Sequence, residues 1–258
     1  MSDNTEQTNL PAQAPLDYLK AVRSLLDHLE STQLDAVEAA ADLVVHALRN
    51  RGAVFCWDIG HGIQHDFTNR AGGLAALKGF SFSFNVNDRL APCLKDRPRD
   101  EEVDAELEAI RLAVRAGNLR PGDVLFLGSV SGRNRKPVEM AMACRDHGVK
   151  VVGLTAMAYT AKVESVHPSG KKLCDAVDVV LDNGAPYGDA AVAIRGMDRP
   201  AMPVSGVGMA VVGWMVWGRV IEKMADQGDP ATVFYSVNRE GGMDAYKASN
   251  ERYAEKGY

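Results

Sequence analysis

The sequence is poor in cysteine, and no pattern joins its cysteines in a motif. Its four cysteines, Cys56, Cys93, Cys144 and Cys174, lie far apart and form no Cys-x-x-Cys pair. This spacing argues against a zinc ribbon or a thiol redox motif. Three of the four lie in or beside apolar runs, so we expect reduced residues of the core.

Long apolar runs are also scarce, which argues against a membrane protein. The most apolar segment, residues 204–225, is uncharged until Arg219, and Pro203 precedes it. These limits leave about 15 residues, or about 22 Å of helix, against the ~30 Å core of a bilayer. Residues 1–15 are polar and do not form a secretory signal. We therefore expect a cytoplasmic protein without a membrane partner, with a mobile tail over residues 1–15.

An excess of positive charge is missing as well. Lys and Arg number 29 and Asp and Glu 34, for a formal net charge of −5. A negative chain without a visible helix-turn-helix extension is not expected to bind nucleic acid. The 46% hydrophobic and 24% charged residues are typical of a globular protein. We expect one α/β domain over residues 16–258.

The common nucleotide-binding motifs are absent, yet residues 124–134 form a candidate phosphate cradle. Val-Leu-Phe-Leu-Gly-Ser-Val-Ser-Gly-Arg-Asn starts as an apolar run, typical of a buried parallel strand, and then becomes small and polar. The helical pattern over 136–145 follows, and a helix start presents free N–H groups and a positive dipole end to an anion. Neither Gly-x-x-x-x-Gly-Lys-Ser/Thr nor Gly-x-Gly-x-x-Gly occurs there. One phosphate on a small metabolite is therefore favoured over a nucleotide.

Several cradle residues are candidates for phosphate binding. Ser129, Ser131 and Asn134 offer side-chain donors, and Gly132 allows a close approach of the backbone. Arg133 adds a positive charge. The alternative is an ordinary helix cap with turn residues.

The order of several motifs resembles the SIS (sugar isomerase) domain family. Ser-x-Ser-Gly-x-Asn at 129–134 is followed by Gly-Val-Lys-Val-Val-Gly-Leu-Thr at 148–155. Gly60-His61, Arg-Ala-Gly-Gly-Leu at 70–74, His-Pro-Ser-Gly-Lys at 167–171 and Asp-Asn-Gly-Ala-Pro at 182–186 extend the likeness. The resemblance implies a phosphosugar-binding protein, with aldose–ketose isomerisation as the leading activity. A non-catalytic sugar-phosphate sensor and an amino-sugar-phosphate lyase or etherase are the alternatives.

The residue pattern and the resemblance predict one fold class. It is a three-layer α/β sandwich with a central five-stranded parallel sheet, Rossmann-like in type, and extra helices near both ends. The expected strands cover 53–57, 79–86, 124–127, 148–155 and 176–181. The expected helices include 16–30, 33–50, 104–116, 204–225 and one that starts near Met243.

A second glycine-bearing turn, residues 58–62, follows the expected strand 53–57. Ligands of open parallel sheets collect at the carboxyl ends of strands, so this turn and the cradle should face one crevice. Gly60 is therefore a candidate for substrate binding. Asp58 departs from the family pattern, which has a small neutral residue there. Its charge would oppose a phosphate unless Arg70 or Arg133 offsets it.

Four residues are candidates for acid–base chemistry. A family carboxylate on the helix after the first turn resembles Asp66 in position, and His65 is its rival. His61 and His167 are candidates for ring opening. His61 and His65 are four residues apart and would share one helix face, so with Asp66 they offer an alternative divalent-metal site. No His-Glu-x-x-His pattern supports that alternative, and we expect no metal and no cofactor. Glu139 lies turns away from the cradle, so we expect no role for it in the site.

The segment after the last expected strand contains candidate sugar ligands. Asp182 and Asn183, with Asp189, are placed to bind sugar hydroxyls, although Asn-Gly and Pro-Tyr-Gly are also ordinary turns. The glycines of 204–225 suggest close packing against another helix or a twin subunit. Together with the N-terminal helices, this segment predicts a homodimer or a dimer of dimers, with a sugar phosphate as the small-molecule partner.

Overall fold

The protein, described here by a computed structural model over residues 13–98 and 101–258, is organised around a parallel sheet. Five strands lie in the order β2-β1-β3-β4-β5, and every neighbouring pair is parallel. The strands are β1 (Val54–Cys56), β2 (Leu77–Gly79), β3 (Val124–Gly128), β4 (Lys150–Thr155) and β5 (Val179–Asp182). The predicted five-stranded parallel sheet is confirmed.

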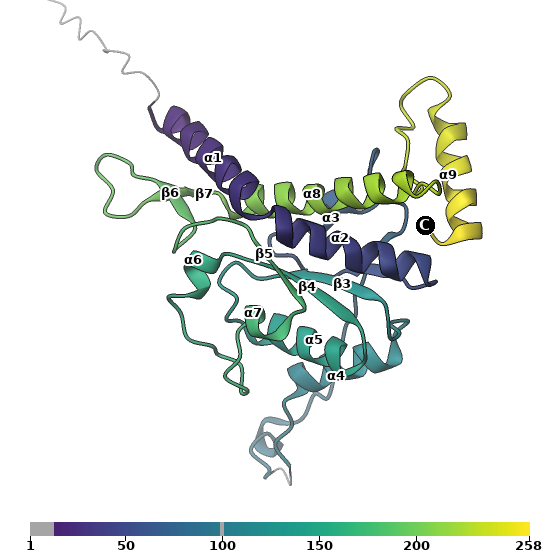
Figure 1. The fold of residues 1–258 in the computed structure, drawn as a ribbon. Coiled ribbons are helices and arrows are strands. Elements are labelled where there is room, and N and C mark those ends of the chain that lie inside the picture. Colours follow the sequence, from purple (N-terminus) through teal and green to yellow (C-terminus); the bar gives the residue numbers. More distant parts are fainter. Residues whose placement is uncertain (1–12, 99–100) are drawn as a thin grey trace, which may run out of the picture.

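Helices cover both faces of the sheet and make three layers (Figure 1). Val124 and Phe126 of β3 join the core with α2 and α8, whereas Leu125 and Leu127 join the core with α4 and α5. This alternation places successive side chains on opposite faces of the sheet. The covering helices are α2 (Leu34–Arg49), α4 (Ala105–Ala116), α5 (Arg135–Asp146), α7 (Leu173–Ala176) and α8 (Ser205–Asp226). The predicted three-layer class is confirmed.

Extra helices flank this unit near both ends of the chain, as predicted. α1 (Gln13–Thr32) precedes α2, and α9 (Gly242–Lys256) follows α8. The predicted tail over residues 1–15 falls outside the described residues except for its end, where α1 begins. Across residues 13–98 and 101–258, no helix is long and apolar enough to cross a bilayer.

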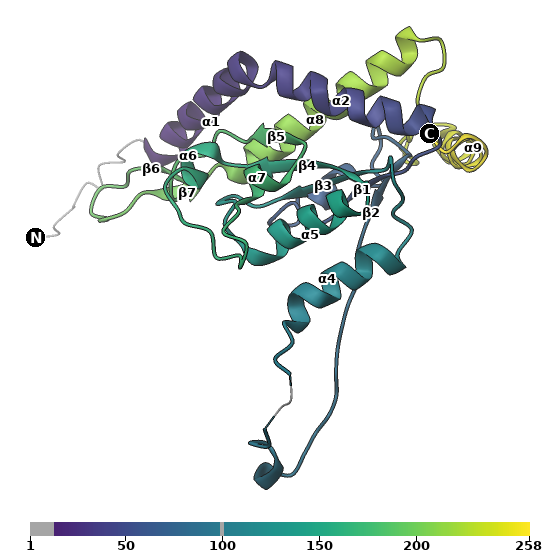
Figure 2. The same ribbon diagram turned by 60° about the horizontal axis from the view of Figure 1, so that its bottom comes forward.

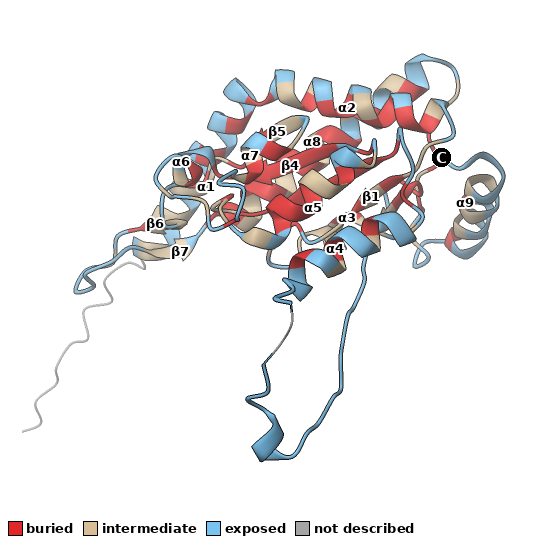
Figure 3. Ribbon diagram, turned by 90° about the horizontal axis from the view of Figure 1, so that it is seen from below, coloured by how far each residue is buried: buried red, intermediate tan, exposed pale blue. Residues whose placement is uncertain are grey.

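One predicted strand has the wrong bounds. The second strand is β2, which covers Leu77–Gly79 instead of residues 79–86, because it pairs only along the three residues of β1 and stops at Gly79. Residues 80–98, called the arm below, then leave the body of the protein and carry the 3-10 helix η1 (Pro92–Leu94) (Figure 2). Figure 3 shows most of the arm as exposed.

Several short elements complete the fold. β6 (Ala190–Val192) and β7 (Ala201–Pro203) form an antiparallel pair that the sequence did not indicate, since three residues are too few for a pattern. The short helices are α3 (Gln64–Phe67) and α6 (Met157–Thr160).

Two glycines of α8 serve contacts within the chain. A Cβ on Gly208 would overlap the carbonyl oxygen of Asn183, and a Cβ on Gly213 would overlap the ring of Phe67. Phe67 packs edge-on against Trp214, with ring centroids 5.7 Å apart. α8 therefore approaches α3 and the loop after β5 closely, which explains both glycines without a second subunit.

Candidate functional site

The turn after β1 and the loop after β3 cross closely at the carboxyl end of the sheet. The N–H of Gly128 donates to the carbonyl oxygen of Asp58 over 3.1 Å. A Cβ on Gly128 would lie 2.7 Å from the carbonyl oxygen of Ile59, so a larger residue would force the two segments apart. Because β1 and β3 are adjacent and parallel, their polar continuations meet at one edge.

A cavity of about 730 Å³ opens where these segments meet. Gly60 and His61 line it from the first turn, and Ser129, Ser131 and Asn134 line it from the cradle. The two turns therefore face one crevice, as predicted. The other lining residues are Asp58, Glu106, Gly128, Val130, Arg135, Lys136, Pro137, Tyr159, Val166, Gly188 and Asp189.

The cradle turns tightly before α5 begins. Gly132 has a φ of 66°, and a Cβ there would lie 2.7 Å from Thr160 Oγ1. The Thr160 hydroxyl donates to the carbonyl oxygen of Ser131 over 3.1 Å, which holds the loop against α6. Asn134 is the N-cap of α5, and its side chain forms no capping hydrogen bond. The start of α5 therefore lies beside the cavity without a side-chain cap.

Ser129 has a buried hydroxyl oxygen that forms no hydrogen bond with any described residue. The residue is 6% exposed, and its N–H donates to the carbonyl oxygen of Leu154 over 2.9 Å, which fixes its position. A buried polar group without a partner costs about 1–3 kcal/mol. A cavity that keeps such a group is suited to a polar ligand.

The cations of the cavity come from the first turn of α5. Arg135 pairs with Asp104, and Lys136 Nζ lies 3.1 Å from Glu106 Oε1. Arg133, one of the two arginines expected from the sequence to balance the acidic turn, does not line the cavity. Both lining cations thus have acidic partners on α4 or at its start.

Two carboxylates of the cavity are held by hydrogen bonds from nearby backbone N–H groups and, for Asp189, also from a serine hydroxyl. Asp58 Oδ1 accepts from the N–H of Gly60 over 3.1 Å. Asp189 accepts from the Ser205 hydroxyl over 2.6 Å and from the Ser205 N–H over 2.8 Å, at the start of α8. Their remaining lone pairs can accept hydrogen bonds from hydroxyl groups in the cavity.

His61 lies in a turn, whereas His65 lies in α3. The φ of His61 is 50°, and α3 begins at Gln64. The prediction that His61 and His65 share one helix face is wrong, because a left-handed turn separates His61 from the helix. His61 lines the cavity and His65 does not. The described residues contain no group of three or more His, Cys, Asp and Glu side chains placed to hold a metal ion.

Asp66 is bound to α8 and to its own segment. Its carboxylate accepts from Trp214 Nε1 over 3.0 Å and pairs with Arg70. It does not line the cavity. Arg70 is therefore engaged with Asp66, and it does not offset the charge of the acidic turn.

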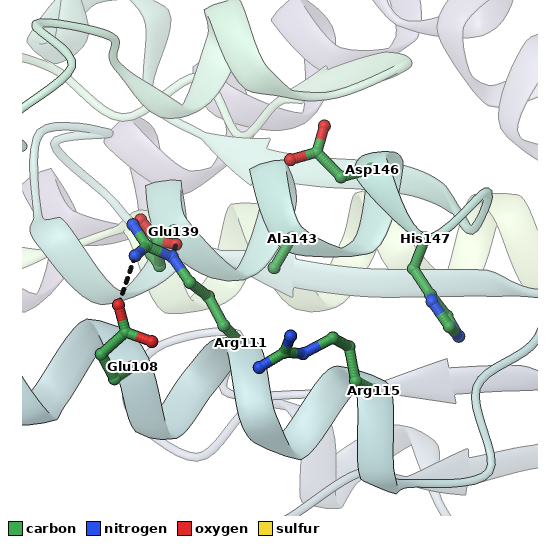
Figure 4. A pocket seen from close by; sticks show the side chains of 7 residues that line it. All are labelled: Glu108, Arg111, Arg115, Glu139, Ala143, Asp146 and His147. Atoms are coloured by element: carbon green, nitrogen blue, oxygen red, sulfur yellow. Dashed lines mark hydrogen bonds and ion pairs between the residues drawn. The ribbon is translucent and has the colours of Figure 1, made fainter.

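His167 is buried against Glu139. Its Nε2 lies 2.8 Å from Glu139 Oε2, and its Nδ1 lies 2.8 Å from Ser169 Oγ. Glu139 also accepts from Arg111 of α4. Figure 4 shows Glu139 and Arg111 at a second cavity of about 260 Å³ between α4 and α5. Both ring nitrogens of His167 are thus engaged outside the cradle cavity.

Asp182 and Asn183 shape the loop after β5. Asp182 Oδ1 accepts from the N–H groups of Met157 and Gly184, at 3.0 Å each. Asn183 is fully buried, and its Oδ1 accepts from the N–H of Ala185 over 2.9 Å. Neither residue lines the cradle cavity.

Sequence reasoning missed several residues of the cavity. Arg135 and Lys136 directly follow the cradle, so their place in the first helical turn was a usable signal. Glu106 and Tyr159 carry no such signal, because α4 and α6 bring them to the cavity from other parts of the chain.

The fold and the cavity define a three-layer α/β protein with a polar crevice at the carboxyl end of its sheet. Residues 17–156 match the family described as the SIS domain. The chain belongs to this family, and the resemblance seen in its motifs is confirmed.

Similar proteins extend this match over most of the chain. The UPF0309 protein of Streptomyces coelicolor is 33% identical over 241 residues, which cover 93% of this chain and 94% of the relative. A UPF0309 protein of Halalkalibacterium halodurans is 34% identical over 230 residues, covering 87% and 91%. Among solved structures, a candidate phosphosugar isomerase of capsule formation from Bacteroides fragilis has a TM-score of 0.50 and 21% identity, covering 88% and 99%. This last likeness shows the fold alone.

Proposed function

We propose that the protein binds a sugar phosphate in the cradle cavity and interconverts its aldose and ketose forms. The observation that carries the proposal is the buried, unpaired hydroxyl of Ser129 beside the uncapped start of α5. Phosphate oxygens accept hydrogen bonds from hydroxyl and N–H groups at such a helix start. Membership of the SIS family supports a phosphosugar, and the Bacteroides fragilis neighbour is itself described as a candidate phosphosugar isomerase.

The charges of the cavity suggest how the ligand is oriented. Asp58, Glu106 and Asp189 line the same space as the cradle. Carboxylates repel a phosphate but accept hydrogen bonds from sugar hydroxyls. We therefore place the phosphate against residues 129–134 and the sugar toward Gly60 and the acidic residues.

Isomerisation requires an acid–base group for ring opening and another for proton transfer between adjacent carbons. His61 is the better placed of the two ring-opening candidates, since it lines the cavity and both nitrogens of His167 are engaged elsewhere. Asp66 of α3 is the proposed proton carrier and His65 is its alternative, so a side chain that lies outside the cavity has to turn toward the sugar when it binds. The protein is proposed to act as a homodimer or a dimer of dimers in the cytoplasm, without a cofactor.

A non-catalytic sugar-phosphate sensor is the second candidate. The contacts of Asp66 with Trp214 and Arg70 favour it, because a carboxylate that holds two helices together is less available as a base. The two candidates share the same ligand and differ only in chemistry.

Binding is tested by thermal unfolding with a panel of sugar phosphates, the corresponding free sugars and inorganic phosphate. A ligand at a hundredfold excess over Kd stabilises the folded state by ~2.7 kcal/mol. Each kcal/mol moves the melting temperature of a domain of this size by about 2–4 °C, so a fitting sugar phosphate should raise it by roughly 5–10 °C. Ser129→Ala and Ser131→Ala should each weaken the stabilisation by the sugar phosphate by about 1–3 kcal/mol. Ser31→Ala, on α1, is the control and should leave this stabilisation unchanged.

Equal shifts of the melting temperature with the free sugar and with its phosphate would contradict phosphate binding by residues 129–134. Catalysis is tested separately, by incubation with the same panel in D₂O and detection of deuterium at the carbon beside the carbonyl. Asp66→Asn should slow this exchange by ~100-fold or more if Asp66 is the base. Binding without exchange across the panel would support the sensor instead.

A further inference from the structure

A further cavity, called the aromatic cavity below, opens beside the cradle cavity, between the end of β1, the base of the arm and the start of α4. It has a volume of about 490 Å³. Asp58, Glu106 and Lys136 line both cavities, so the two spaces are neighbours. Each volume alone lies within the ~300–1,000 Å³ that is typical of a complete small-molecule site. One simple sugar phosphate at residues 129–134 therefore accounts for the cradle cavity and not for the aromatic cavity.

The lining of the aromatic cavity is charged only where it meets the cradle cavity. Its charged residues are the three that the two cavities share. Apart from Ser83, the residues that line the aromatic cavity alone are apolar: Trp57, Phe82, Phe84, Ala105, Ala109 and Ile110. Apolar walls favour a group whose own apolar surface leaves water on binding. A ligand that spans both cavities therefore needs a polar end in the cradle and an apolar end here.

Contacts within the chain fix part of this apolar wall. The N–H of Trp57 donates to the carbonyl oxygen of Phe126 over 2.8 Å, which holds the Trp57 backbone against β3. The Trp57 ring stacks on Phe82, with ring centroids 6.3 Å apart. Ile110 of α4 is 1% exposed and belongs to the core on this face of the sheet, and Trp57 packs against the same core. A wall that is already in place needs little ordering when an apolar group binds to it.

We propose that the ligand of the cradle is a sugar phosphate with an aryl or alkyl substituent, and that this substituent binds in the aromatic cavity against Trp57 and Ile110. The inference rests on the proposed binding of a sugar phosphate and adds the chemical class of the ligand. The phosphate lies at residues 129–134, and the sugar hydroxyls lie beside Asp58 and Glu106. The apolar group extends past these two carboxylates, from a sugar oxygen away from the phosphate.

The lining also disfavours two other occupants of the aromatic cavity. A second phosphate would have to pass Asp58 and Glu106, whose carboxylates repel an anion. A second sugar ring would bring hydroxyl groups to a space where, beyond the shared residues, only the side chain of Ser83 can bond them. Hydroxyl groups that are buried without a partner weaken binding. An apolar group meets neither obstacle.

The first test uses the unaltered protein and measures Kd by calorimetry. The probes are the 6-phosphates of glucose, mannose and glucosamine, their mono-O-benzyl ethers at each free hydroxyl group, and the matching mono-O-glucosyl derivatives. At least one benzyl ether should bind at least about tenfold more tightly than its parent, since each buried methylene changes Kd roughly fourfold. The glucosyl derivatives should bind no more tightly than the parents.

The outcomes separate this inference from the proposed function. Parents that bind while no benzyl ether binds more tightly would overturn the inference and leave the proposed function standing. Tighter binding of the glucosyl derivatives alone would also overturn it, because the cavity would then hold a second sugar ring. Absence of binding by every phosphate, with or without a substituent, would contradict both.

The second test places the benzyl group in the molecule. Ala109 of α4 is half-buried and lines the aromatic cavity but not the cradle cavity. Ala109→Leu narrows the aromatic cavity, so the ratio of the Kd of the parent to that of its benzyl ether should fall from about tenfold or more toward one. The matched control is Ala113→Leu, one turn further along α4, since Ala113 is half-buried and lines neither cavity. It should keep the wild-type ratio.

Trp57→Ala provides a second variant, because it removes the stacked ring without filling the cavity. The ratio of the two Kd values should fall here too. Both constants come from one variant, so a general loss of stability changes them alike. A wild-type ratio in both Ala109→Leu and Trp57→Ala would place the benzyl group elsewhere and overturn the proposal.

Discussion

His167 Nε2 lies 2.8 Å from Glu139 Oε2, and each side chain is 3% exposed. The pair joins the loop after α6 to the middle of α5, and Arg111 adds a contact from α4. Three segments on one face of the sheet therefore meet at one carboxylate. The pair holds the structure behind the cradle, and it lies outside the cradle cavity itself.

Removal of Glu139 should destabilise the protein strongly. Glu139→Ala leaves the His167 ring buried without its hydrogen-bond partner and removes one partner of Arg111, and a buried polar group left unpaired costs about 1–3 kcal/mol. The free energy of unfolding in urea measures this loss. Glu108→Ala is the matched control, since Glu108 binds the same Arg111 over 2.7 Å at the surface. Exposed pairs contribute about 0–1 kcal/mol, so equal losses for the two variants would contradict a structural role for the buried pair.

Two glycines of α8 should respond to alanine in opposite directions. Gly208→Ala sets a methyl group against the carbonyl oxygen of Asn183, so we expect a loss of about 1–3 kcal/mol by overpacking. Gly218→Ala meets nothing within 4 Å and lies in mid-helix, so we expect a gain of up to ~1 kcal/mol from helix propensity. Thermal unfolding of the two variants separates the effects. A destabilising Gly218→Ala would show that this face of α8 is covered in the assembled protein.

The contact between α2 and α8 should weaken in acid. The Arg219 guanidinium, 2.6 Å from Glu38 Oε2 through Nε, and the Lys223 ammonium lower the pKa of Glu38 to about 2. The ordinary value is 4.5, so the contribution of this pair is fully present above that pH and is lost as the pH falls toward 2. Glu38→Gln should flatten this part of the stability–pH curve, measured by urea unfolding between pH 3 and 6.

Glu30→Gln, an exposed position on α1, is the control for this acid effect and should keep the wild-type slope. High salt should reduce the difference in the slope of stability against pH between the wild type and Glu38→Gln, because the ion pair is exposed and therefore screened. An identical slope in the two proteins would exclude Glu38 as a source of the acid sensitivity.

Local patterns in the sequence were sufficient to predict the helices and strands whose apolar residues follow a regular pattern. Helical spacing marked α2 and α8, and the apolar run of β3 marked a strand buried on both faces. The order of the motifs was sufficient to identify the family and hence to predict the parallel sheet. The place of Ser129, Ser131 and Asn134 between a strand end and a helix start also followed from the sequence, since the three residues are close in the chain.

Contacts between distant residues were decided only by the tertiary structure. Asp66 and Trp214 are far apart in the chain, and no local pattern shows that α8 brings an indole N–H to that carboxylate. The same holds for Glu139 and His167. The alternation over 79–86 correctly marks an extended chain with one apolar face, yet it does not say what covers that face. A strand needs a neighbour for its hydrogen bonds, and β1 supplies one only as far as Gly79 because hydrogen-bond pairing depends on the length of both strands.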